Sequence, residues 1–130
     1  YGKGGQTRGF LNIKDTLNCV DIATRNPAKP GEFRVMNQFT EQFSINDLAN
    51  KVKQAGTRAG LSVEITNLKN PRVEEEAHYY NAKHSKLQEL GLQPNLLTDE
   101  VVDSMLATVQ KNNSNIDDSS FCPRIKWKND

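Results

Sequence analysis

The sequence predicts an α/β fold, because two kinds of hydrophobic pattern follow each other along the chain. Short segments in which apolar and polar residues alternate are typical of strands, and they are interleaved with longer segments whose apolar residues recur every three or four positions, as in amphipathic helices. Glycine and proline mark the boundaries. The order is strand, helix, strand, helix, strand, helix, helix, which permits parallel strand pairing but does not prove it.

The chain opens with one predicted strand and one predicted helix. Residues 8–14 alternate and predict the strand. Asp15 or Thr16 can then cap a helix that ends at Asn26, because a residue before proline disfavours helical geometry. The apolar residues of this helix are Leu17, Val20, Ile22 and Ala23.

A second strand and a second helix follow a short loop. Residues 32–37 alternate and predict a strand that is buried on at least one face, whereas residues 38–42 are polar. Ser44 and Asp47 resemble a capping box, and the helix that they open runs to Gly60. The apolar positions of this helix are Ile45, Leu48, Ala49, Val52, Ala55 and Ala59.

The second half of the chain predicts one strand and two helices. Residues 61–66 alternate and lead into a turn at residues 70–72. A short helix over residues 81–90 is stopped by Gly91, and Thr98 caps the last helix. The expected buried stripe of the last helix is Val101, Val102, Met105, Leu106 and Val109.

Size, charge and cysteine content narrow the class of protein. The chain has 130 residues, enough for one domain at most, and no apolar run approaches the roughly 20 residues that cross a bilayer. Seventeen Lys+Arg against 16 Asp+Glu give a formal net charge of +1 without a basic stripe, which disfavours nucleic acid as a main partner. Cys19 and Cys122 are too few for a disulfide framework and predict reduced thiols.

The chain is expected to be a fragment or a processed product of something larger. It begins with Tyr1 rather than Met, and its hydrophobic content of 35% is low for an independent globular domain. Processing of a mature terminus is the alternative, because the first residue alone does not separate the two explanations.

A cluster of glycines near the start is a candidate phosphate cradle. Gly2, Gly4 and Gly5 would let backbone N–H groups approach an anion that Lys3 and Arg8 neutralise. The segment lacks the Gly-Lys-Ser/Thr ending of a P-loop, and it precedes a strand, whereas a dinucleotide fingerprint follows one. Judged alone, the segment favours a hairpin turn.

Two further pairs of residues have types seen at catalytic or metal sites, but neither pair is expected to be functional here. Tyr79 and Lys83 have the Tyr-x-x-x-Lys spacing by which an ammonium activates a phenol for proton transfer, but no cofactor fingerprint lies upstream in this chain, so packing by Tyr79 is favoured. His78 and His84 fall on different helix faces with no cysteine at ligand spacing, so no metal site is expected. No catalytic nucleophile set can be assembled.

Arg8 and Arg72 are the best candidates for binding an anion. A guanidinium suits two-point contact with phosphate oxygens, and two arginines brought together from distant strands would clamp a diphosphate. The neighbours of Arg72, Glu74 to Glu76, could hold a cation or a ribose, although such a run is usually a solvated surface. Taken singly, each arginine is more commonly explained as an ordinary surface residue that binds no ligand.

Four stretches of the chain resemble one enzyme family. Residues 1–16, YGKGGQTRGFLNIKDT, are similar to the segment that opens the substrate-binding part of the extended short-chain dehydrogenase/reductases, the nucleotide-sugar epimerases and dehydratases. Residues 26–43, 70–84 and 87–92 extend the resemblance, and the strings NQFTEQF and EAHYYNAK within them are specific. The closer resemblance is to the sulfolipid-biosynthesis branch of plastids and cyanobacteria, and it runs to about Met105.

The resemblance implies the C-terminal substrate-binding portion of an extended short-chain dehydrogenase/reductase. By the same resemblance, the N-terminal Rossmann portion, with the NAD site and the catalytic Tyr-x-x-x-Lys, would be absent from this chain. Residues 1–111 would be the nucleotide-sugar binding portion, incomplete without the Rossmann domain, and residues 112–130 a polar C-terminal tail. The full enzyme would act on UDP-glucose and sulfite, and this segment alone would be inactive, with no catalytic, cofactor-binding or metal-binding residue.

By position, the resemblance places five residues at the nucleotide sugar. Tyr1 would lie near the uracil, Gln6 and Arg8 would approach the UDP moiety, Arg72 would grip the diphosphate, and Glu75 would meet a ribose hydroxyl. The resemblance also implies the chloroplast stroma, with the cyanobacterial cytoplasm as the alternative, and is compatible with a homodimer or a larger plastid assembly. A non-catalytic truncated subunit and another nucleotide-sugar epimerase or dehydratase remain the alternatives.

Overall fold

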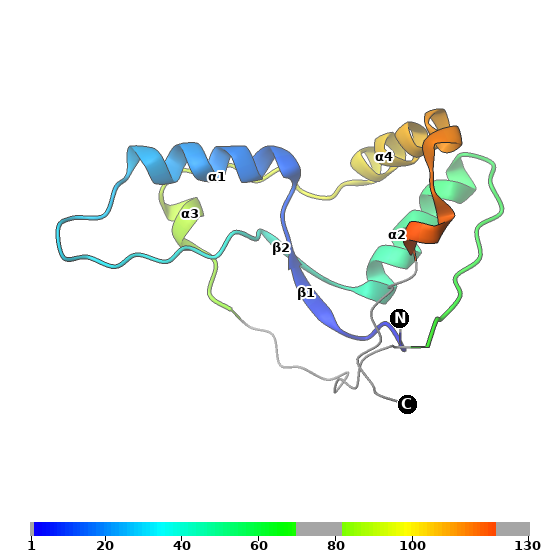
Figure 1. Ribbon diagram of the computed structural model, residues 1–130, viewed down its shortest axis with the longest axis horizontal. Coiled ribbons are helices and arrows are strands. Elements are labelled where there is room, and N and C mark those ends of the chain that lie inside the picture. Colours follow the sequence, from blue (N-terminus) through cyan, green and yellow to red (C-terminus); the bar gives the residue numbers. More distant parts are fainter. Residues whose placement is uncertain (1, 70–81, 122–130) are drawn as a thin grey trace. The chain divides into compact units, whose positions relative to one another are not determined.

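The computed structural model describes residues 2–69 and 82–121 of the chain, and Figure 1 shows the arrangement of its elements. In chain order these are β1 (Thr7–Phe10), α1 (Ile13–Arg25), β2 (Glu41–Ser44), α2 (Ile45–Arg58), α3 (Lys86–Glu89), α4 (Asp99–Lys111) and the 3₁₀ helices η1 (Asn113–Asn115) and η2 (Asp118–Phe121). β1 and β2 pair in a small antiparallel sheet. This mixture of helix and sheet is compatible with the predicted α/β class.

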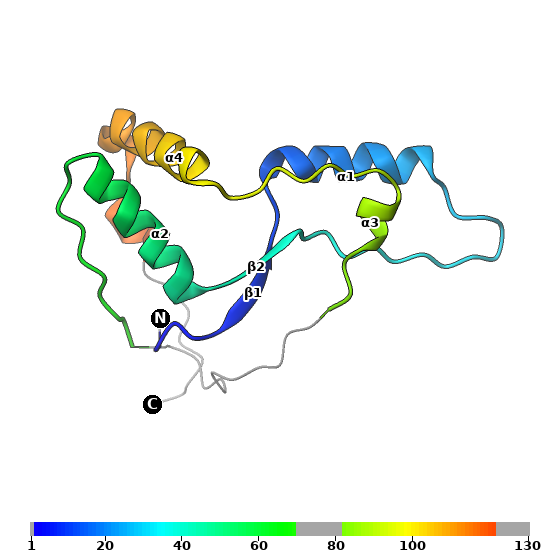
Figure 2. The ribbon, with the colours of Figure 1, turned by 180° about the vertical axis from the view of Figure 1, so that it is seen from behind.

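The described chain divides into two compact units. The α1–α3 unit comprises residues 7–43 and 82–97, and the α2–α4 unit comprises residues 2–6, 44–69 and 98–121. Within the first unit α1 lies beside α3, and within the second α2 packs against α4, as both views show (Figures 1 and 2).

α2 begins and ends where the sequence predicts. Asp47 N donates to Ser44 Oγ (3.1 Å) while Ser44 N donates to the Asp47 carboxylate (2.9 Å), which completes the capping box. The hydrogen bonds from Ser44 lower the pKa of Asp47. At the other end Gly60 has a φ of 74°, a left-handed conformation that glycine adopts without strain, and Leu61 N donates to Gly56 O (2.8 Å).

α1 begins earlier than predicted, so the predicted strand over residues 8–14 is shortened to β1. Asn12 caps the helix instead of Asp15 or Thr16, because its side chain accepts a hydrogen bond from Lys14 N (3.0 Å). The C-terminal end at Arg25 is the one predicted.

The apolar residues that the sequence places on α1 are only partly buried. Asp15 and Cys19 are fully buried and Ile22 is half-buried, whereas Leu17 and Val20 are 71% and 53% exposed. Helical periodicity identifies apolar positions but does not say which face a partner covers. The core of this unit comprises Cys19, Leu87 and Leu92, with Leu11, Ile22 and Met36 packed against it.

Asp15 is a buried anchor in the α1–α3 unit. Its carboxylate accepts hydrogen bonds from Asn95 N (2.7 Å) and Asn95 Nδ2 (2.6 Å), which tie the segment after α3 to the first turn of α1. The neighbouring Cys19 is a free thiol whose pKa is raised, chiefly by burial and then by the charge of Asp15. Cys122 lies outside the described residues.

Two predicted strands are wrong. Residues 32–37 and 61–66 form no strand in the structure, and β2 forms instead at residues 41–44, which overlap a segment predicted only to be polar. Alternation indicates a chain that can pair, but a strand exists only where a second strand meets it. The predicted polar tail from residue 112 also contains η1 and η2.

α4 is confirmed in position but only partly in its buried stripe. Val102 is buried and Val101 and Leu106 are half-buried, whereas Met105 and Val109 are 59% and 51% exposed. α3 is confirmed as a helix but is shorter than the predicted range.

The start of α4 uses its predicted cap residue in an unexpected way. Thr98 occupies the cap position, but its side chain accepts no backbone hydrogen bond there. Its hydroxyl instead bonds the Glu100 carboxylate and is the leading cause that lowers the pKa of Glu100.

An ion pair closes the loop between α1 and β2. Arg34 Nη2 lies 2.8 Å from Glu32 Oε2, Arg34 Nη1 donates to Asn26 O (2.8 Å), and Lys29 N donates to Glu32 Oε2 (3.0 Å). The hydrogen bond from Arg34 is the main reason that the pKa of Glu32 falls to about 2, followed by the bond from Lys29.

Replacing Arg34 with glutamine is expected to raise the pKa of Glu32 toward its ordinary 4.5, because the main cause of the shift is removed. The folded pKa is the lower one, so Glu32 stabilises the fold above about pH 4.5 and this contribution is lost as the pH falls toward about 2. An NMR titration of the Glu32 carboxyl carbon measures the change. Asp47 is the internal control, because its lowered pKa depends on Ser44. A titration midpoint of Glu32 that stayed near 2 in the variant would contradict the role given to Arg34.

Candidate functional site

The glycine-rich turn is held by the first turn of α2. Gly4 is buried with a φ of 73°, and a Cβ there would overlap the Asn46 carboxamide. Asn46 Nδ2 donates to Lys3 O (3.0 Å) and Asn46 N donates to Gly4 O (3.0 Å), while Gly2 N donates to Leu68 O (2.8 Å). The segment is a turn, as predicted, but it is not a hairpin turn, because β1 pairs with the distant β2.

Gln6, a predicted substrate-binding residue, carries an acceptor without a donor. The residue is half-buried, and within the described part of the chain its buried Oε1 atom has no hydrogen-bond partner. Leaving a buried acceptor unpaired costs about 1–3 kcal/mol, so this oxygen suits a donor from water or from a ligand. Thr40 Oγ1 is a second such atom, and nothing in the sequence pointed to it.

Arg8, the second described candidate, is half-buried in β1. Its Nη1 donates to Thr7 O (2.9 Å), and no ion pair joins it to a carboxylate within residues 2–69 and 82–121. A guanidinium has five N–H donors, so most of them remain for an anion. The other predicted contacts, Tyr1, Arg72 and Glu75, lie outside the described residues, and the two-arginine clamp stays a prediction.

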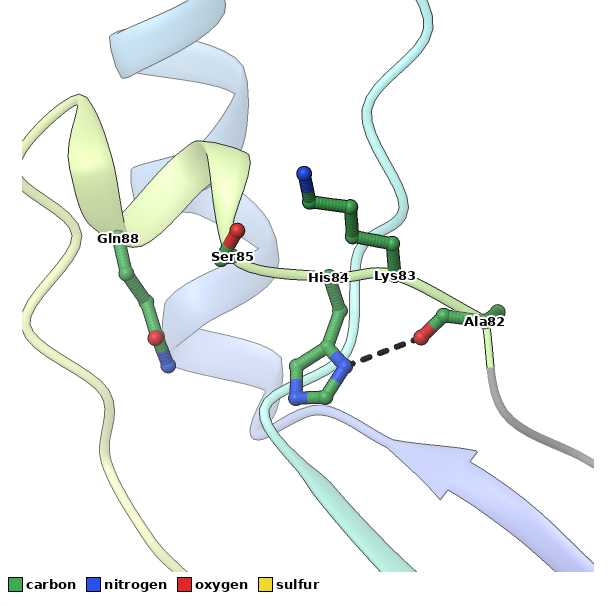
Figure 3. A pocket seen from close by; sticks show the side chains of 5 residues that line it. All are labelled: Ala82, Lys83, His84, Ser85 and Gln88. Carbon is green, nitrogen blue, oxygen red and sulfur yellow. Dashed lines mark hydrogen bonds between the residues drawn. The ribbon is translucent and has the colours of Figure 1, made fainter.

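A shallow hollow of about 340 Å³ lies in the α1–α3 unit. It is lined by Ala82, Lys83, His84, Ser85 and Gln88. In Figure 3 the Lys83 side chain and the His84 ring project to opposite sides of the chain. His84 Nδ1 lies 3.1 Å from Ala82 O, and its ring lies on Phe39 with centroids 4.4 Å apart, so His84 serves packing. Tyr79 and His78 lie outside the described residues, so the Tyr79–Lys83 spacing is not tested.

Residues 2–69 and 82–121 contain neither a cluster of metal-binding side chains nor a membrane-spanning helix. No group of three or more His, Cys, Asp or Glu side chains there is arranged to hold a metal ion. None of the helices there has the length and apolar character needed to cross a membrane.

Two carboxylates hold residues 92–97 by hydrogen bonds, and the sequence did not indicate either of them. Asp15 binds Asn95, and Glu41 Oε2 accepts a hydrogen bond from Leu97 N (2.7 Å). Their partners lie 80 and 56 residues away, so no local pattern could have indicated either bond.

Comparison with known proteins shows what the chain is similar to. No protein-family model matches it. A synthase from Spinacia oleracea is 56% identical over 128 residues, which are 98% of this chain and 27% of the relative. A synthase from Sulfolobus acidocaldarius is 41% identical over 130 residues, which are 98% of this chain and 33% of the relative. The chain is thus similar to part of a longer enzyme.

Both relatives are named UDP-sulfoquinovose synthase, and the spinach protein is described as chloroplastic. The chain matches the C-terminal part of such a synthase, which confirms the resemblance seen in the sequence. It spans a third or less of the length of these relatives.

Proposed function

We propose that this chain supplies the UDP-sugar binding portion of a UDP-sulfoquinovose synthase. The observation that carries the proposal is the 56% identity with the spinach synthase across 98% of the chain. The full enzyme joins UDP-glucose and sulfite to form UDP-sulfoquinovose for sulfolipid biosynthesis, with bound NAD. Its location is the chloroplast stroma, with the cyanobacterial cytoplasm as the alternative, and the segment alone is inactive.

The residues that bind the nucleotide sugar are Tyr1, Gln6, Arg8, Arg72 and Glu75. Two features of the described residues support this part of the proposal. Gln6 has a buried oxygen that lacks a donor, and Arg8 has N–H groups that no carboxylate occupies. In their proposed roles the two arginines neutralise the diphosphate, which orients the sugar for the chemistry carried out by the rest of the enzyme.

The glycine turn does not have the arrangement of a dinucleotide-binding turn. The glycine turn leads into β1 and opens no helix, and the N–H group of Gly2 already donates to Leu68 O. A dinucleotide needs a glycine turn that follows a strand and opens a helix, so that free N–H groups meet the pyrophosphate. In the proposal, NAD therefore belongs to the part of the full-length protein that lies outside this chain.

The test uses a full-length chimera, defined as the spinach synthase carrying this chain in place of its matching part. We expect the chimera to form UDP-sulfoquinovose from UDP-glucose only when sulfite is added, and the 130-residue chain alone to form none. Turnover of UDP-glucose without sulfite would favour an epimerase or dehydratase. A chimera that is folded, with the melting temperature of the spinach synthase, but inactive would favour a non-catalytic subunit.

A further inference from the structure

A stack of two rings lies against the strand β1 within the α1–α3 unit. The ring of His84 lies on the ring of Phe39, with centroids 4.4 Å apart and an angle of 32° between the ring planes. Phe39 is buried, and its ring lies in turn against Gly9 of β1, where a Cβ atom would come within 2.6 Å of Phe39 Cγ. Gly9 therefore lets the stack reach the backbone of the strand, because a side chain at this position would collide with the ring.

Hydrogen bonds on either side fix the stack relative to β1. Thr40 N, directly after the buried ring in the sequence, donates to Phe10 O (3.0 Å) at the end of β1. Asn37 Nδ2 donates to Lys83 O (2.7 Å), directly before the imidazole in the sequence. Both rings are thus tied to backbone next to them, and an aromatic pair of this geometry contributes more than its buried area alone.

Arg8 occupies the other face of the same strand. Successive side chains of a strand point to opposite faces, so Arg8 faces away from the side on which the stack meets Gly9. Arg8 is half-buried, and its Nη1 donates to Thr7 O (2.9 Å). A binding side chain keeps its productive geometry only where neighbouring residues hold it, and the stack supports the backbone of Arg8 from behind.

We propose that Phe39 and His84 are positioning residues for Arg8, and that by supporting β1 they hold its guanidinium at the diphosphate of the UDP-sugar. Neither ring touches the ligand in this role, so neither is a catalytic residue. The inference rests on the proposed function, because the diphosphate contact of Arg8 is taken from there. It deepens that function by naming two residues, both distant from Arg8 in the sequence, that set the affinity for the nucleotide sugar.

The test measures the affinity of the full-length chimera for UDP-glucose by isothermal titration calorimetry. His84→Ala removes the outer ring and is expected to weaken binding about five- to tenfold, because a displaced binding group loses part of its contact. The kcat at saturating UDP-glucose and sulfite is expected to change by less than about twofold, since the diphosphate contact is the same in the ground state and the transition state. His84→Phe keeps a ring on Phe39 and is expected to restore the affinity of the unsubstituted chimera.

A double-mutant cycle shows whether the stack acts through Arg8. Adding His84→Ala to Arg8→Ala is expected to change the affinity by less than about twofold, because the group that the stack positions is then gone. Effects that multiply in the double variant would show that the ring acts in some other way and would overturn the proposal. An unchanged affinity in a folded His84→Ala variant would overturn it as well, because the stack would then serve packing alone.

Gln88→Ala is the matched control, because Gln88 lines the same hollow as His84 but is exposed. Its expected change in affinity is below about twofold. Should His84→Ala prevent folding, His84→Gln takes its place in the cycle, since it removes the ring but keeps a polar side chain.

The two hypotheses fail in different ways. Failure of the proposed binding role shows as an unchanged affinity in Arg8→Ala, and this inference then falls with it. Failure of this inference alone shows as weakened binding in Arg8→Ala beside unchanged binding in His84→Ala. The cycle needs only binding, so it still decides this inference if the chimera forms no product from UDP-glucose and sulfite.

Discussion

Replacing Arg72 with alanine in the full-length chimera is expected to weaken the binding of UDP-glucose by about ten- to a hundredfold. A hydrogen bond to a charged group contributes about 1.5–3 kcal/mol, and each 1.4 kcal/mol is a factor of ten in affinity. Arg8→Ala is expected to have an effect of the same size, because the two guanidinium groups are proposed to share the diphosphate. Isothermal titration calorimetry measures both dissociation constants.

Two further variants test whether the effect belongs to the clamp. Arg8→Lys keeps the charge but loses two-point contact, so it should fall between the wild type and Arg8→Ala. Arg58→Ala is the control, because the Arg58 guanidinium is already bound by Asp103 (2.6 Å) and Asp99 (3.3 Å) in an exposed network that contributes little. Unchanged affinity in both alanine variants at Arg8 and Arg72 would exclude the clamp.

Asp15→Asn is expected to lower the free energy of unfolding by about 2–4 kcal/mol. The fully buried carboxylate accepts two hydrogen bonds from Asn95, one from the backbone and one from the side chain. An amide in its place turns one acceptor into a donor, which then faces another donor at a fully buried position. Urea unfolding of the chimera, with a check that the slope is unchanged, measures the loss.

The same substitution at Asp21 provides the control on the same helix. Asp21 pairs with Arg25 at 2.9 Å, but the side chains are 58% and 75% exposed. Such a surface pair contributes about 0.5 kcal/mol or less, so Asp21→Asn should be nearly neutral. If Asp15→Asn were equally mild, the buried carboxylate would not be the anchor that the structure indicates.

The elements that could be predicted are those whose first or last residue is set by side chains close to it in the sequence. The capping pair of Ser44 and Asp47 and the glycine at position 60 define α2, and the proline at position 27 marks the end of α1. Each of these signals acts between residues that are at most four or five positions apart, so the sequence displays them completely.

The candidate site was predicted by a different route, and it stays a prediction. The residue pattern alone suggested two arginines as anion ligands, and the resemblance to nucleotide-sugar enzymes added Gln6 as a contact. The structure adds that Gln6 Oε1 is buried without a donor, a fact that depends on packing and that no pattern displays. Tyr1, Arg72 and Glu75 lie outside the described residues and stay predictions.

By itself, the sequence determined the positions of α2 and α4, the end of α1 and the kinship with UDP-sulfoquinovose synthases. Only the tertiary structure decided which face of α1 is buried, which extended segments pair, and that Asp15 binds a residue 80 positions away. The physical reason is the range of the interactions. Helix caps and turns form between residues that are close in the sequence. Burial and strand pairing depend on which segment, distant in the sequence, packs against a surface or pairs with a strand.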